Sequence, residues 1–115
     1  MNAMDVARGD IWLIYLDPTR GKEQAGNRPA LIVSDDRLNQ SEAGLVIVVP
    51  LTSRDTGIDS HVPLDPAQDD IKAASYAACE QIRAISKERL KKKWGTASAG
   101  KIAQVEQSLR FLLGM

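Results

Sequence analysis

Short apolar runs bounded by turn residues constrain this chain more than any other feature of its sequence. Residues 10–17 (DIWLIYLD), 29–34 (PALIVS) and 45–52 (LVIVVPLT) are rich in Ile, Val, Leu and aromatic residues, with Gly, Pro, Asp or Ser around them. Such β-branched runs are typical of strands and are too short for helices. They predict a mainly β fold.

Two further segments predict weaker strands. Residues 61–64 (HVPL) contain Pro63, which cannot donate a ladder hydrogen bond and therefore belongs at a sheet edge. Residues 74–86 (ASYAACEQIRAIS) alternate loosely and end at Ser86, a suitable N-cap for a following helix.

The basic run of residues 87–93 (KERLKKK) has two readings, a nucleic-acid patch or an ordinary solvated helix. Because Leu90 and Trp94 stand four positions apart, we favour a short amphipathic helix whose lysines face water. Trp12 and Trp94 are interpreted as core or dimer-interface anchors, since their neighbours are apolar or helical.

After Ser98 the apolar residues recur at spacings of three and four, which marks one stripe of a helix: Ile102, Val105, Leu109, Leu112 and Leu113. Ser98 is the expected N-cap and Gly114 the expected C-terminal stop. Several strands followed by one packing helix predict an α+β protein, a small and partly open β-barrel with the helix laid across it.

Composition limits the function. The 15 basic and 15 acidic residues give a formal net charge of zero, which argues against coating nucleic acid by bulk charge but leaves a local basic patch open. His61 is the single histidine, so a metal site of several imidazoles and paired-histidine catalysis are excluded. We expect His61 to be a surface residue without a role.

Length and the absence of targeting signals indicate the location. With 115 residues we expect a single domain, and no apolar run is long enough for a membrane span or a signal peptide. The one cysteine, Cys79, fits a reducing compartment. These features predict a cytoplasmic protein.

The long segment of residues 17–28 is the first candidate site, because two strands of a hairpin need only a short turn and long loops are usually functional or mobile. Gly21 and Gly26 permit sharp bends, while Pro29 pushes Arg28 toward extended geometry. A guanidinium held there offers a planar fork of donors to a phosphate.

The second candidate is the end of the 45–52 strand, where Thr52 and Ser53 project hydroxyls and Arg54 adds charge. Each of these residues alone is ordinary turn chemistry. Only their combination with the first loop suggests a site.

Taken together, RGDIWLIYLDP, GKEQAGNRPALIVS, VVPLTS and CEQIRAIS resemble the MazF/PemK family of ribosome-independent endoribonuclease toxins, from about Arg8 to Leu113. The specific elements are EQ-x-G-x-RP and, further on, PLTS. The resemblance implies an SH3-like barrel, a homodimer, cleavage of single-stranded RNA at short sequences without metal or cofactor, and neutralisation by a MazE-like antitoxin with a disordered tail.

The resemblance also implies site residues. The arginine of RP is Arg28 and the threonine of PLTS is Thr52, and in the family they serve attack of the ribose 2′-hydroxyl on the adjacent phosphate. Because arginine has a pKa above about 12, our hypothesis is that Arg28 stays charged and binds the phosphorane oxygens. Thr52 donates to the same group, and Glu23 orients the 2′-hydroxyl or accepts its proton.

One part of the family pattern is not carried over. The PemK branch uses an arginine and an aspartate near the segment AACEQIR and a histidine in the first loop, whereas these positions read Ala78, Glu80 and Lys22. Since single-stranded bases offer their edges to polar side chains, the candidate RNA contacts are Lys22, Gln24, Asn27, Ser53, Arg54, Glu80, Gln81 and Arg83.

Two alternatives stay open. A gyrase-poisoning toxin of the CcdB type shares the barrel but performs no catalysis, and that group ends in a tryptophan-containing tail, whereas this chain ends FLLGM. A barrel that has lost its activity and only binds its partner is the other alternative, and the presence of Arg28 and Thr52 speaks against it.

Overall fold

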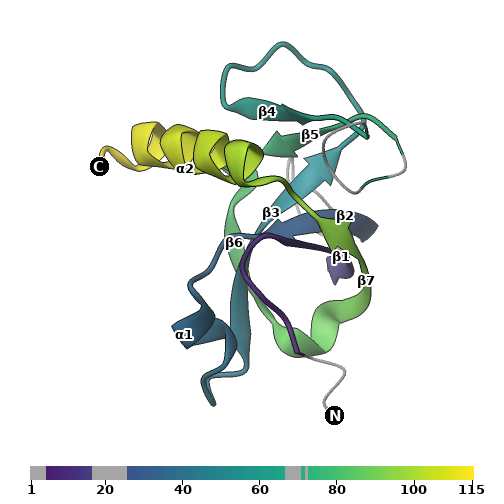
Figure 1. The fold of residues 1–115 in the computed structure, drawn as a ribbon, viewed down its shortest axis with the longest axis vertical. Helices are drawn as coiled ribbons and strands as arrows, with labels where there is room; N and C mark the ends of the chain where they lie inside the picture. Colours follow the sequence, from purple (N-terminus) through teal and green to yellow (C-terminus); the bar gives the residue numbers. More distant parts are fainter. Residues whose placement is uncertain (1–4, 17–25, 67–70, 72) are drawn as a thin grey trace.

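The computed structural model describes residues 5–16, 26–66, 71 and 73–115 (Figure 1). Within them the chain forms an antiparallel seven-stranded sheet with the order β4-β5-β3-β2-β1-β7, and β6 pairs with β3 beside β5. The strands are β1 (Asp10–Leu16), β2 (Gly26–Ile32), β3 (Leu45–Thr52), β4 (His61–Leu64), β5 (Ser75–Ala78), β6 (Arg83–Ser86) and β7 (Leu90–Thr96).

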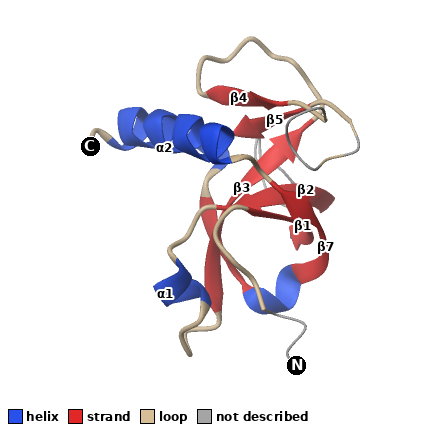
Figure 2. Cartoon of the chain, viewed as in Figure 1, coloured by secondary structure: helices blue, strands red, loops and turns tan. Residues whose placement is uncertain are grey.

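The helical elements are few. They are α1 (Asp36–Asn39), α2 (Ala99–Leu113) and the 3-10 turns η1 (Cys79–Gln81) and η2 (Lys87–Arg89). The sheet ends at β4 and β7, which do not pair with each other in the described part of the chain, and α2 lies across β4 and η1 (Figure 2). The predicted mainly β fold, a partly open barrel with a C-terminal helix, is confirmed.

The sheet buries a different apolar cluster on each face, because side chains alternate along a strand. The first cluster contains Val6, Trp12, Ile14, Leu16, Ala30, Ile32, Val46, Val48, Ile85 and Leu90. The second contains Ile11, Leu31, Val49, Leu51, Val62, Leu64, Ala77, Cys79, Ala97 and Val105. Helix α2 supplies Val105 and therefore covers the face of the second cluster.

Helix α2 has the N-cap residue and the C-terminal stop that the sequence predicts, but its buried apolar stripe is shorter than predicted. Ser98 Oγ accepts a hydrogen bond from the Lys101 backbone N–H at 3.3 Å, and Gly114 ends the helix with φ of 72°. Leu112 and Leu113 are 39% and 58% exposed, because the helix extends past the small sheet that it packs on (Figure 1).

The prediction of an amphipathic helix at residues 87–93 is wrong. Ser86 does act as a cap, with its hydroxyl accepting from the Glu88 N–H, but the capped element is the short turn η2. Strand β7 follows because β1 offers a free edge, on which Leu90 pairs with Ile14. Trp94 is 38% exposed and so lies outside the core.

Two strand boundaries also differ from the prediction. Residues 74–86 form two strands separated by η1, because β5 pairs with the end of β3 and β6 with its beginning. Strand β2 begins at Gly26, so Arg28 lies inside a strand rather than at the end of a loop. Trp12 is buried in the first cluster, and Pro63 lies on the edge strand β4, as predicted.

None of the helices in the described residues is both long and apolar enough to cross a membrane.

Candidate active site

The two residues singled out from the sequence, Arg28 and Thr52, lie where β3 parts from β2. The pairing of these strands runs from Ile32↔Val48 to Ala30↔Pro50. The ladder ends there, and the same register continued by two positions would set Arg28 across from Thr52. Beyond Pro50, β3 pairs on its other side with β5, while β2 stays paired with β1 as far as Gly26. The site is therefore a place where two neighbouring strands separate.

Both side chains belong to the same face of the sheet. Arg28 shares the two-residue period of Ala30 and Ile32, and Thr52 shares that of Val48, all in the first cluster. A guanidinium and a hydroxyl so placed can converge on one bound group, on the face that α2 leaves uncovered.

Thr52 is held in place by the turn that follows it. Its side chain is buried, and its hydroxyl oxygen accepts the Arg54 backbone N–H at 3.2 Å. Hydroxyl groups at strand ends commonly cap the next turn in this way. Since a hydroxyl that accepts one hydrogen bond still has its own hydrogen, Thr52 keeps a donor for a ligand.

Arg28 is fixed by its strand. Its backbone pairs with Ile14 in β1, and the side chain is half-buried. Held in this way, the guanidinium has a planar set of donors that matches two phosphate oxygens, which a lysine cannot match.

Tyr76 is a neighbour that sequence reasoning missed. It pairs directly with Thr52 in the β3–β5 ladder and with Pro63 in the β4–β5 ladder, and its side chain is half-buried. Thr52 and Tyr76 thus form a row across β3 and β5, on the face that strand alternation also gives to Arg28. Alternation within ASYAA could have given its face, but only the strand register could have given its partner.

The remaining predicted contacts divide into several groups. Ser53 and Arg54 follow Thr52 directly and are exposed. Asn27 is exposed opposite Tyr15, and strand alternation puts its side chain on the other face from Arg28. The predicted base Glu23 and the predicted contacts Lys22 and Gln24 lie outside the described residues.

Arg83 and Gln81 are not brought to this row. Arg83 pairs with Val48, four positions before Thr52 along β3, which corresponds to about 13 Å at the usual rise of a strand. Gln81 lies in η1, between β5 and β6. These residues could reach only a different part of a bound chain.

Glu80 is tied to the loop before β4. One carboxylate oxygen accepts the Ser60 hydroxyl at 2.6 Å, and the other lies 2.7 Å from His61 Nε2. The His61 side chain is only 7% exposed, so the expectation that it lies on the surface is wrong. Burial raises the pKa of Glu80, but the hydrogen bonds from Ser60, its own backbone and His61 outweigh burial, and the pKa is lowered overall.

The cysteine is a core residue. Cys79 is fully buried in the second cluster, and burial raises the pKa of its thiol. A protonated, enclosed thiol is a poor nucleophile. Across the described residues, no group of three or more His, Cys, Asp or Glu side chains could hold a metal ion.

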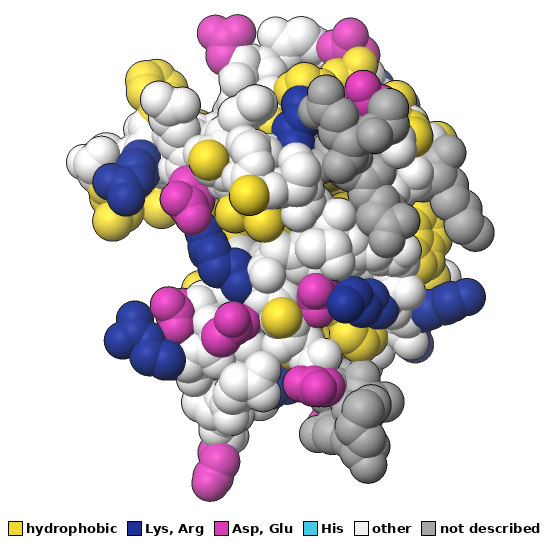
Figure 3. Space-filling view, viewed as in Figure 1, with side chains coloured by type: hydrophobic (Ala, Val, Ile, Leu, Met, Phe, Trp, Pro, Cys, Tyr) yellow, Lys and Arg dark blue, Asp and Glu magenta, His cyan; other side chains and the backbone are white. Residues whose placement is uncertain are grey.

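Charges of both signs alternate over the surface seen in Figure 3, in keeping with the zero net charge. Apolar side chains gather on the same view at the C-terminal end of α2, where Phe111 and Met115 are 84% and 83% exposed.

A family model and a curated relative both assign this chain to the same family. The family model of the "PemK-like, MazF-like toxin of type II toxin-antitoxin system" matches residues 7–113. The chain is 37% identical over 113 residues to the endoribonuclease MazF9 of Mycobacterium tuberculosis, covering 94% of this chain and 96% of MazF9.

Solved structures agree. The chain is similar to MazF from Deinococcus radiodurans, with a TM-score of 0.81, 31% identity and coverage of 95% of this chain and 96% of that one. It is also similar to a chain of the MazE–MazF structure from the same organism, with a TM-score of 0.77, 28% identity and 96% coverage of both chains.

Proposed function

This chain belongs to the PemK-like, MazF-like family of toxins of type II toxin–antitoxin systems, and from that membership we propose that it is an endoribonuclease that cleaves single-stranded mRNA. The observation that supports the proposal is that strand alternation gives Arg28 and Thr52 the same face, next to the point where the β2–β3 ladder ends.

The proposed reaction is internal transfer at phosphorus. The ribose 2′-hydroxyl attacks the adjacent phosphate, the bond to the 5′-oxygen of the next nucleotide breaks, and the products end in a 2′,3′-cyclic phosphate and a 5′-hydroxyl. An attached nucleophile requires only positioning, proton transfer and stabilisation of the extra charge on the phosphorane. These needs are met without a metal ion or other cofactor.

Each residue has a proposed part in this reaction. Arg28 binds two phosphorane oxygens with its planar, charged guanidinium. Thr52 donates its hydroxyl hydrogen to the same group, while its oxygen accepts the Arg54 N–H. Glu23 keeps its role as a hypothesis, to orient the 2′-hydroxyl or to accept its proton.

Base recognition is assigned to the residues around this phosphate. Ser53 and Arg54 are exposed beside Thr52 and are suited to contact the neighbouring nucleotide. Lys22, Gln24, Asn27, Gln81 and Arg83 remain candidate contacts for more distant bases, and the cleavage motif depends on them.

The proposed partners follow from the relatives. We infer a homodimer that is neutralised by a MazE-like antitoxin, supported by the MazE–MazF structure from Deinococcus radiodurans. A cytoplasmic location fits an mRNA substrate. Sedimentation of the purified protein at its monomer mass of 12.5 kDa, across micromolar concentrations, would contradict the dimer.

The CcdB-like alternative is not favoured. The family model and the MazF9 relative both point to the RNA-cleaving toxins. Failure of the protein to inhibit DNA gyrase in a supercoiling assay is the expected result.

The test of the proposed function is primer-extension mapping of cut sites on a long single-stranded RNA, with and without EDTA. We expect discrete cuts at a short sequence, unchanged by EDTA, with 5′-hydroxyl ends that a kinase can label directly. Cleavage that disappears on chelation, or products with 5′-phosphate ends, would contradict the proposed chemistry.

A further inference from the structure

We propose that Glu80 is a positioning residue: its carboxylate holds the loop of residues 53–60, which joins β3 to β4, in the shape that presents Ser53 and Arg54 to RNA beside Thr52. The proposal rests on the proposed function and assigns Glu80 an indirect role in place of the direct RNA contact expected from the sequence.

Glu80 binds the C-terminal end of this loop through both of its carboxylate oxygens. Ser60 and His61 are consecutive residues, and they engage the two different carboxylate oxygens at 2.6 and 2.7 Å. Glu80 itself is anchored in η1, directly after the paired strand β5. A carboxylate accepts hydrogen bonds with both oxygens, and bonds to an ionised acceptor are the strong ones.

Polar contacts also connect residues inside the loop. The ionised Glu80 carboxylate can only accept, and His61 Nε2 faces it, which leaves the other ring nitrogen, Nδ1, on the side of the loop. That nitrogen lies 3.5 Å from the Thr56 hydroxyl, inside the loop. Toward the site, Asp55 accepts the Gly57 N–H at 3.2 Å.

The other end of the loop is Thr52 itself, whose hydroxyl accepts the Arg54 N–H. Residues 53–59 are all exposed, so apolar burial contributes little to their order. The shape of the loop next to Thr52 therefore depends on these hydrogen bonds, and Glu80 holds the strongest of them.

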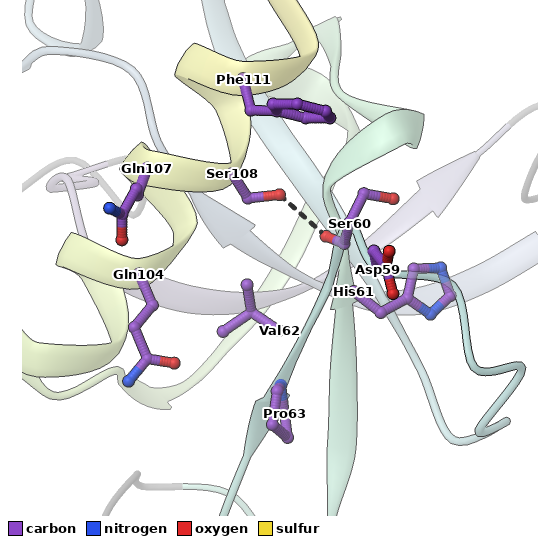
Figure 4. A pocket seen from close by; sticks show the side chains of 9 residues that line it. All are labelled: Asp59, Ser60, His61, Val62, Pro63, Gln104, Gln107, Ser108 and Phe111. Carbon is purple, nitrogen blue, oxygen red and sulfur yellow. Dashed lines mark hydrogen bonds between the residues drawn. The ribbon is translucent and has the colours of Figure 1, made fainter.

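Helix α2 also holds the C-terminal end of this loop, at Ser60. The Ser108 hydroxyl of α2 donates to the Ser60 carbonyl at 3.0 Å, across a pocket of about 390 Å³ between the helix and residues 59–63 (Figure 4). In this view the Ser108 hydroxyl reaches the Ser60 carbonyl from α2, while the His61 side chain points away from the helix.

The test uses a fluorogenic single-stranded RNA that carries the cut site mapped by primer extension. Glu80→Ala should raise KM on the order of tenfold and leave kcat within about twofold, because the loop loses order while Arg28 and Thr52 stay in place. In the RNA-free protein, the NMR amide signals of Ser53 and Arg54 should shift or broaden. Glu42→Gln, an exposed carboxylate on the turn before β3, is the control and should behave as wild type.

A second comparison separates indirect from direct action. The double variant Ser60→Ala/His61→Phe removes both partners of the carboxylate, and adding Glu80→Ala to it should raise KM no further. An additional rise would mean that Glu80 touches RNA, which overturns the proposal. Unchanged amide signals of Ser53 and Arg54 in Glu80→Ala would also overturn it.

The two proposals fail differently. If the wild-type protein cuts no RNA, the proposed function fails, and the amide signals still test whether Glu80 orders the loop. If the wild type cuts and Glu80→Ala lowers kcat with KM unchanged, only the positioning role is wrong.

Discussion

Arg28 and Thr52 are each constrained before any substrate arrives. Arg28 sits within a paired strand next to a proline, and the Thr52 hydroxyl is oriented by the Arg54 N–H. Groups held in place beforehand stabilise developing charge without the cost of ordering them during the reaction. This is the reason to expect that small changes in either side chain have large effects on rate.

Substitution of Arg28 separates charge from geometry. Arg28→Ala should lower kcat/KM by a factor on the order of 100 or more, as expected when a donor to the reacting group is lost. If charge dominates, Arg28→Lys should keep measurable cleavage of the fluorogenic RNA. An equal loss in both variants would favour the planar fork or proton transfer over charge.

At the scale of elements, β3 organises the site because it changes partners along its length. On one edge it pairs with β6 over Leu45–Val48 and then with β5 at Leu51 and Thr52, and on its other edge it pairs with β2 over Val48–Pro50. Thr52 and Tyr76 are paired at this end of β3, and helix α2 contributes Val105 to the cluster on the opposite face.

Truncating the α2 contact should weaken the fold rather than the chemistry. Val105 is 1% exposed in the second cluster, so Val105→Ala should cost roughly 2 kcal/mol in the free energy of unfolding. Urea unfolding at a fixed protein concentration measures this. The exposed Gln104→Ala on the same helix should change it by less than about 0.5 kcal/mol, and equal effects of the two changes would contradict the packing assigned to α2.

At the scale of the whole molecule, the surface at the C-terminal end of α2 exposes large apolar side chains to solvent. Phe111, Leu113 and Met115 are all more than half exposed, while the net charge is zero. Exposed apolar clusters mark surfaces that bind other proteins. This is compatible with the proposed homodimer and antitoxin.

Global stability should depend on pH through Glu80. Its pKa in the folded protein is lowered from 4.5, so its contribution is present above that value and is lost as the pH falls through the lowered folded pKa. Wild-type stability in urea should therefore fall below about pH 4.5 more steeply than that of Glu80→Gln. Ser60→Ala, which removes one of the bonds that lower the pKa, should give an intermediate slope. Parallel curves for wild type and Glu80→Gln would contradict the prediction.

Several features of the fold could be predicted from local patterns in the sequence. The alternation and β-branched content of the first three strands, Pro63 at an edge, and the capping residues of α2 all act within a few residues of each other, so the sequence carries them directly. The site residues Arg28 and Thr52 came from the family resemblance, and their roles stay predictions.

Other features were decided only by tertiary contacts. The lysine-rich segment is a strand because the edge of β1 was available to pair with it, and His61 is enclosed because Glu80 lies beside it. Leu112 and Leu113 are exposed because the surface under α2 ends. What the sequence determines by itself is local propensity; which strands become neighbours, and so which side chains share a face, depends on pairing between distant segments.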